Sequence, residues 1–261
     1  MNTHRLQVPM IILASAISAL QSAALETVRS TCILSASEHP GKLRLRIEND
    51  ACGDNGHCGT SLNEETMDRL TGISLTDLGH EGEHLTATLT AEAGTLTCSG
   101  TVHNGSLIGD SAFTPNAAFA AHMEQIGFSG LDSEKLQVYA LVNVESAWAH
   151  SLQEMGIQGL TADKLIPLKI FNANPEYVRS ITALGYDQPS ADQLVAMRVQ
   201  GVNAEEIREI RALGYQPTFD ELMQIRIFQI TPDFIKRMQV RGLKNLTIAK
   251  LMQIRIFKLD E

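Results

Sequence analysis

The chain has 261 residues, a net charge of −9 and an aromatic content of 5%. This length is sufficient for one large domain or two small ones with a buried core. The acidic balance argues against sequence-independent nucleic-acid binding, because that activity needs a basic surface that displaces counterions.

Residues 1–24 have the three parts of a secretory signal peptide. The start MNTHR is positively charged, the run LQVPMIILASAISAL is largely apolar, and Ser22 and Ala24 are small residues before a plausible cleavage site. The apolar run is short for a bilayer span, and no later segment approaches 18 apolar residues. We therefore expect an exported protein, periplasmic or extracellular, with no stable membrane span after cleavage. The alternative is a buried N-terminal helix.

Residues 25–115 are predicted to form a small antiparallel β domain. The segment KLRLRIEN places Leu43, Leu45 and Ile47 on one face, as a half-buried strand does. A second alternating stretch, HLTATLTAEAGTLTCSGTVHNG, contains a hairpin signal at Asn104-Gly105. The segment NEETMDRL predicts a short helix. Five Lys and Arg against thirteen Asp and Glu in residues 25–116 give this part a charge of −8.

Export changes how the cysteines are interpreted. The chain has four cysteines, and all of them lie in the β half: Cys32, Cys52, Cys58 and Cys98. An even number in an oxidising compartment favours two disulfides. Cys52 and Cys58 close a short Gly-rich loop, so we expect them to pair locally and leave Cys32 with Cys98. The sequence does not choose among the three connectivities. A metal site formed by Cys52, His57 and Cys58 is the competing interpretation.

The segment His80–His84, HEGEH, formally matches the H-E-x-x-H zinc motif. Zinc hydrolysis requires both histidines on one face of a helix, with the glutamate as general base. Here Gly82 interrupts the segment and strand-like residues follow it, so a polar turn is the favoured interpretation. A metal-dependent hydrolase using His80, Glu81 and His84 is the alternative. No Gly-rich phosphate loop or G-x-S-x-G elbow is present, and we expect neither catalysis nor a cofactor.

Residues 116–261 change to a helical period and repeat themselves. Glycines recur at steps of 29, 29, 29 and 28 residues, and the heptapeptide LMQIRIF occurs twice. A leucine follows each glycine by nine residues, or by eight in one case: Leu136, Leu165, Leu194, Leu222 and Leu251. A fixed period in this range is typical of solenoid proteins. The predicted fold class is therefore α+β, with the β domain followed by an α-solenoid of helix-turn-helix repeats.

Each unit contains two short predicted helices, A and B. Helix A follows a capping residue: Asp132, Thr161, Ser190, Thr218 or Thr247. Helix B follows a similar residue: Asn116, Asn174, Asn203 or Thr231. The recurrent glycine ends helix B, because glycine adopts the left-handed conformation without strain. A two-helix unit cannot bury its own apolar face, so stacked neighbours must supply the core. In the two copies of LMQIRIF, we expect the leucine, Ile225 and Ile254, and Ile227 and Ile256 to form this stacking face.

One column of charge recurs on helix A, four residues after each leucine from Leu165 onward: Lys169, Arg198, Arg226 and Arg255. Stacking would turn this column into a basic stripe. We predict that the stripe contributes to binding of an acidic protein, or of the acidic β domain of the same chain. Pairing of these cations within the helical part is the alternative.

The repeat sequences NPEYVRSITALGY, NAEEIREIRALGY and SADQLVAMRVQGV resemble helical repeats of exported bacterial proteins, particularly from acidobacteria. They are also similar to repeats in the tails of some metallopeptidase-type antibiotic sensors, whose peptidase part has no counterpart here. The preceding segment AGTLTCSGTVHNGSLIGDSAFTPNAAF resembles the β segment of those proteins. The resemblance implies an envelope protein but no active-site residues. We expect a non-enzymatic module that binds a protein partner in the cell envelope, with a sensor ectodomain as a further alternative. The oligomeric state is left open.

Overall fold

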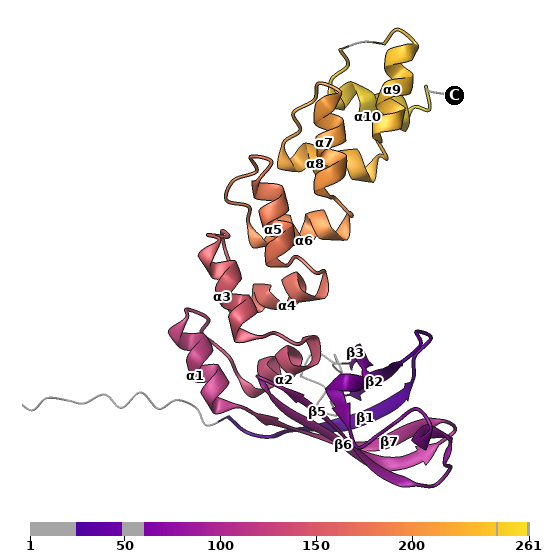
Figure 1. The fold of residues 1–261 in the computed structure, drawn as a ribbon, viewed down its shortest axis with the longest axis vertical. Helices are drawn as coiled ribbons and strands as arrows, with labels where there is room; N and C mark the ends of the chain where they lie inside the picture. Colours follow the sequence, from indigo (N-terminus) through magenta and orange to yellow (C-terminus); the bar gives the residue numbers. More distant parts are fainter. Residues whose placement is uncertain (1–24, 49–59, 244, 260–261) are drawn as a thin grey trace, which may run out of the picture.

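In the computed structural model, which describes residues 25–48, 60–243 and 245–259, the chain forms an antiparallel β domain followed by an array of helices (Figure 1). The fold is therefore α+β, as expected. Residues 1–24, predicted to be a signal peptide, lie outside the described residues, as do Cys52 and Cys58. None of the described helices has the length and apolarity needed to cross a membrane.

The β domain is a single seven-stranded antiparallel sheet in the order β3-β2-β1-β7-β6-β5-β4. Its strands are β1 (Val28–Ala36), β2 (Lys42–Glu48), β3 (Thr60–Thr66), β4 (Leu70–Thr71), β5 (His84–Ala91), β6 (Gly94–His103) and β7 (Ser106–Pro115). The predicted alternation is confirmed in β2, where Leu43, Leu45 and Ile47 are buried. The hairpin at Asn104-Gly105 is also confirmed, since both residues have positive φ between β6 and β7.

The helix predicted over Asn63–Leu70 is wrong for most of its length. Asn63 lies in β3 and pairs with Leu45 of β2, and only the 3₁₀ turn η1 (Met67–Arg69) is helical. Pairing with β2 satisfies the backbone of Asn63–Thr66 across the sheet, which overrides the local helix preference of this polar segment.

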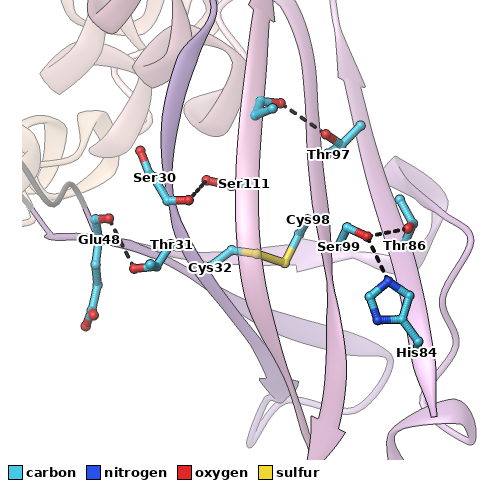
Figure 2. The surroundings of a disulfide bond; sticks show 11 residues. Ser30, Thr31, Cys32, Glu48, His84, Thr86, Thr97, Cys98, Ser99 and Ser111 are labelled. Atoms are coloured by element: carbon cyan, nitrogen blue, oxygen red, sulfur yellow. Dashed lines mark hydrogen bonds between the residues drawn. A yellow bond between two sulfur atoms is a disulfide. The ribbon is translucent and has the colours of Figure 1, made fainter.

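A disulfide joins Cys32 of β1 to Cys98 of β6, as predicted (Figure 2). The two strands are not neighbours, because β7 lies between them. Their Cα atoms are nevertheless 6.0 Å apart, so the sheet is strongly curved at this point. Gly100 and Gly109 pair nearby, and a Cβ atom at Gly109 would lie 2.0 Å from the carbonyl oxygen of Ser99. The curvature therefore requires glycine here.

The described part of the chain contains ten α-helices. The odd-numbered helices are α1 (Ala117–Gln125), α3 (Ser146–Glu154), α5 (Pro175–Thr182), α7 (Ala204–Ala212) and α9 (Pro232–Val240). The even-numbered helices are α2 (Ser133–Val142), α4 (Ala162–Ile170), α6 (Ala191–Val199), α8 (Phe219–Ile227) and α10 (Ile248–Ile256). The even helices contact one another in succession. Among the odd helices, α3 contacts α1 and α5, and α7 contacts α9, so the array has two rows (Figure 1).

The helix boundaries agree with the predicted signals. Every predicted capping residue is the N-cap of its helix, and all except Thr161 accept a backbone N–H with the side chain. The recurrent glycines, from Gly127 to Gly242, have positive φ after the odd helices. A second left-handed residue follows each even helix and was not predicted: Asn143, Asn172, Gly201, Gln229 and Lys258. Both turns of each unit are therefore set by a left-handed residue.

The sheet and the first helices share one hydrophobic core. Helix α2 packs against β1, β5, β6 and β7, and the cluster of buried residues that begins at Cys32 continues through the array to Leu222. A second cluster, around Ile230 and Phe234, joins α7 to α10. The β domain thus covers one end of the array, while α9 and α10 lie at the opposite end of the molecule (Figure 1).

Candidate functional site

The predicted basic column lies in the last turn of the even helices, and its cations contact other parts of the chain. The Nε atom of Arg198 donates to the carbonyl oxygen of Phe171 at 2.9 Å, and that of Arg226 donates to Gln200 at 2.8 Å. Arg255 donates from Nη2 to the carbonyl oxygen of Gln229 at 3.2 Å. Each accepting carbonyl lies just beyond the preceding even helix, so each guanidinium ties one unit to the one before it.

Aromatic rings and acids complete these contacts. The guanidinium carbon of Arg198 lies 4.9 Å from the ring centroid of Tyr177, and that of Arg255 lies 4.3 Å from the centroid of Phe234. Arg226 instead forms an ion pair of 2.9 Å with Glu206. These contacts explain the regular spacing of the column through packing within the chain. A role of the four cations in partner binding stays a prediction.

Lys169 occupies the same position in α4 but makes different contacts. Its Nζ atom lies 3.6 Å from a carboxylate oxygen of Glu145 and 4.8 Å from the ring centroid of Trp148. An ammonium has no planar fork with which to reach a carbonyl and stack at the same time. A half-open cavity of about 260 Å³ adjoins this lysine, lined by Trp148, Leu168, Lys169, Asn172 and Asn174. The lone tryptophan is thus partly a packing residue and partly a cavity wall.

Next to the cations, a row of apolar side chains was not predicted. Each is the last residue of an even helix, and 52 to 57% of its surface is exposed: Ile170, Val199, Ile227 and Ile256. We call this set the apolar ladder. The expectation that Ile227 and Ile256 belong to the stacking face is therefore wrong. Five residues along a helix turn the side chain by roughly 140° from the buried leucine, so these residues point away from the core.

The first unit shows what a covered version of this position looks like. Leu141 of α2 is the residue equivalent to Ile170 by the 29-residue period, and it is only 4% exposed. Its carbonyl oxygen accepts hydrogen bonds from Asn63 at 2.6 Å and from Arg69 at 3.2 Å. Arg69 also donates to the carbonyl oxygen of Ala140 at 2.7 Å. The β domain therefore caps the C-terminal end of α2.

Glu65 lies behind this cap and is 1% exposed. It forms an ion pair with Arg69 and accepts a hydrogen bond from Asn63. Burial raises the pKa of the Glu65 carboxyl above its ordinary value, and the attraction of Arg69 opposes this increase. A carboxylate buried in this way depends on both of its partners, so the cap forms one polar network.

The HEGEH segment forms a turn and the first residue of β5, after the 3₁₀ turn η2 (Asp77–Gly79). His80 pairs with Glu83 at 2.9 Å, while His84 lies 3.3 Å from the hydroxyl of Ser99. Glu81 contacts His103 and Asn104, and the hydrogen bond from His103 lowers the pKa of its carboxyl. Within the described ranges, no three His, Cys, Asp or Glu side chains are close enough together to hold a metal ion.

The comparisons with known proteins supply no assignment for this arrangement. No protein-family model, curated protein or solved structure matches the chain. The functional interpretation therefore rests on the described residues themselves. Of the predicted site residues, the cations lie along one edge of the array, and Cys32 and Cys98 are bonded in the sheet core. The apolar ladder beside the cations was missed, although a β-branched residue five positions after each leucine from Leu165 onward is visible in the sequence.

Proposed function

We propose that the helical part is an α-solenoid and that the protein is an exported, non-enzymatic interaction module of the cell envelope. It binds a protein partner along the edge that carries the apolar ladder. The observation that carries this proposal is the matched exposure of Ile170, Val199, Ile227 and Ile256 at equivalent positions.

Single exposed apolar residues are normal on protein surfaces, whereas a row of them along one edge is typical of an interaction surface. Each ladder residue directly follows a member of the basic column. An apolar row flanked by cations suits a partner segment with alternating apolar and acidic side chains. Solenoids commonly bind partners along such extended surfaces.

The first unit supports this interpretation by analogy within the chain. There the equivalent residue, Leu141, is covered, and the β domain donates hydrogen bonds to the helix end beside it. The same edge of α4, α6 and α8 has no such cover within the described residues. A partner would cover the C-terminal ends of these helices as the β domain covers the C-terminal end of α2.

The proposed location rests on three features of the chain. The first 24 residues have the pattern of a signal peptide, and the disulfide between Cys32 and Cys98 is compatible with an oxidising compartment. The resemblance of the repeats to exported bacterial proteins points to the same compartment. The partner is therefore sought in the cell envelope.

The test replaces three ladder residues together, as Ile170→Ser, Val199→Ser and Ile227→Ser. The tagged protein is cross-linked in the native envelope, purified and quantified by mass spectrometry against wild type. The expected result is loss of the proteins retained by wild type. The matched control carries Leu75→Ser, Ile108→Ser and Val240→Ser, which are exposed apolar residues elsewhere. If both triple variants retain the same proteins as wild type, the proposal is wrong.

A further inference from the structure

One position at the far end of the array differs from all its equivalents. The residue that follows the left-handed turn after each even helix is buried in the first four units, as Val144, Ala173, Val202 and Ile230, with exposures of 0 to 2%. The fifth equivalent, Leu259, is 67% exposed. Phe257, two residues before it, is exposed to the same extent.

The backbone of this last turn is the same as in the other units. The N–H of Leu259 donates to the carbonyl oxygen of Ile254 at 2.9 Å, just as Ile230 donates to Ile225 at 2.8 Å. Lys258 has a φ of 52°, and its equivalent Gln229 has a φ of 53°. The exposure of Leu259 therefore does not arise from a different backbone conformation; among the described residues, no element packs over this side chain.

The helix before this turn is also less covered than its equivalents. Ile254 of α10 is only partly buried, whereas Ile225 of α8 and Met197 of α6 are 2% and 1% exposed. In those inner units, the next even helix packs alongside. At the opposite end of the array, the sheet packs against α2 in the place where an inner helix has a neighbouring even helix. Among the described residues, no element packs against the corresponding outer side of α10.

The charges on the even helices specify the neighbour further. Lysines occur in the position before the recurrent leucine in three units. Lys135 forms an ion pair of 2.7 Å with Asp163, and Lys164 forms one of 2.5 Å with Asp192. Each aspartate lies in the first turn of the next even helix. Lys250 of α10 is the third such lysine, and among the described residues it has no ion-pair partner.

Two of the inner even helices also carry a cation in the last turn that contacts the end of the preceding even helix. In α6 and α8 an arginine six residues after the first-turn aspartate donates to the carbonyl just beyond the preceding even helix. At α10 the corresponding carbonyls belong to Phe257 and Lys258. A helix that fits this end therefore has an aspartate in its first turn, an apolar face, and an arginine six residues after the aspartate.

We propose that the α10 end of the array is a docking site for an amphipathic helix of this chemistry, supplied by a partner protein. It would lie against α10 as α6 lies against α4, covering Ile254 and Leu259 and pairing its aspartate with Lys250. This surface and its occupant differ from the ladder, so the two proposals can fail separately. A second copy cannot extend the array head to tail, because its sheet occupies the position before α2.

The site is tested with a peptide that carries the required pattern. The probe is a fluorescently labelled peptide with the sequence of residues 190–215, which spans α6 and α7 and includes Asp192 and Arg198. It is titrated into the full-length protein and followed by fluorescence anisotropy. Saturable binding is expected. Leu259→Ser is expected to weaken it about tenfold or more, because an apolar side chain loses its burial.

A charge exchange tests the orientation of the docked helix. Lys250→Glu is expected to weaken binding about threefold to tenfold, since attraction is replaced by repulsion. A peptide with Asp192→Lys is expected to recover binding to that variant. Val240→Ser is the matched control for Leu259→Ser, because Val240 is 88% exposed but lies at the end of α9.

Three results would overturn the proposal. One is the absence of saturable peptide binding, and another is binding that Leu259→Ser and Val240→Ser weaken equally. The third is a self-association of the protein alone, measured by sedimentation velocity, that Leu259→Ser abolishes, because the occupant would then be a second copy. Thermal unfolding of the variants shows whether they are folded, and Leu259→Ser is expected to unfold like wild type because the side chain is exposed. The Ile170, Val199 and Ile227 triple variant is expected to bind the peptide normally, which separates this site from the ladder.

Discussion

The two ends of the helical array have similar units but very different surroundings. At the first end, the β domain caps α2, and both Leu141 and Val144 are buried. At the far end, Leu259 has the same backbone arrangement as Val144 but lies open to solvent. The comparison shows that the burial of these side chains depends on the structural element that packs against the unit. The unit itself folds in the same way in both places.

Breaking the cap at the first end is expected to have the largest effect. Arg69→Met removes the donor to α2 and leaves Glu65 buried without its ion-pair partner. We expect a loss of about 3–5 kcal/mol in the free energy of unfolding, measured by urea denaturation. The double variant with Glu65→Gln removes the unpaired charge and is expected to recover part of the loss. If Arg69→Met alone costs no more than an ordinary surface substitution, the cap does not hold α2.

A matched pair of substitutions compares a covered unit with the uncovered one. Ile230→Ala removes a fully buried side chain, so we expect a loss of about 2–5 kcal/mol. Leu259→Ala removes an exposed side chain at the equivalent position, and we expect a change within about 0.5 kcal/mol. Both are measured by the same denaturation experiment. Equal losses in the two variants would show that Leu259 is covered in solution.

Two substitutions in the basic column test how the units between the two ends are joined. Arg226→Met removes the hydrogen bond to the Gln200 carbonyl and the ion pair with Glu206, and we expect a loss of about 1.5–3 kcal/mol. Lys169→Met removes only a surface ion pair and a contact with Trp148, so we expect a loss below about 1 kcal/mol. Thermal and urea unfolding give the comparison. The reverse ranking would mean that the carbonyl contacts do not join the units.

The smallest expected effect is the pH dependence of the cap. The pKa of Glu65 is raised in the folded protein, so the folded state binds more protons than the unfolded state above the ordinary glutamate pKa. This contribution to stability is therefore present at low pH and is lost as the pH rises through the raised pKa. Relative to Glu65→Gln, wild type is expected to lose unfolding free energy over that interval. Parallel curves for the two proteins would contradict this expectation.

The sequence was sufficient for the helix boundaries because those signals are local. A capping residue at each start and a glycine after each odd helix satisfy backbone groups within a few residues of the chain. The same holds for the alternating strand β2. The pairing of Cys32 with Cys98 is predicted because Cys52 and Cys58 are close in sequence and are expected to pair with each other. The structure confirms the Cys32–Cys98 disulfide, and Cys52 and Cys58 lie outside the described residues.

The errors and omissions concern positions whose state depends on distant residues. Asn63–Thr66 has the composition of a helix but pairs with β2, and this partner is not visible in the local pattern. The apolar character of Ile227 predicts a place in the stacking face, although its angular position on α8 turns it outward. The cap formed by Asn63 and Arg69 joins residues more than 70 positions apart, so no local signal could have indicated it.

The division of the buried residues into two clusters has a consequence for how the molecule opens. The cluster shared with the sheet extends to Leu222, whereas the cluster around Ile230 and Phe234 belongs to α7–α10 alone. Amide hydrogen exchange should therefore resolve two cooperative opening units, with the distal one exchanging at lower free energy. A helix that docks on α10 would slow exchange in the distal unit by mass action while leaving exchange in the sheet unchanged.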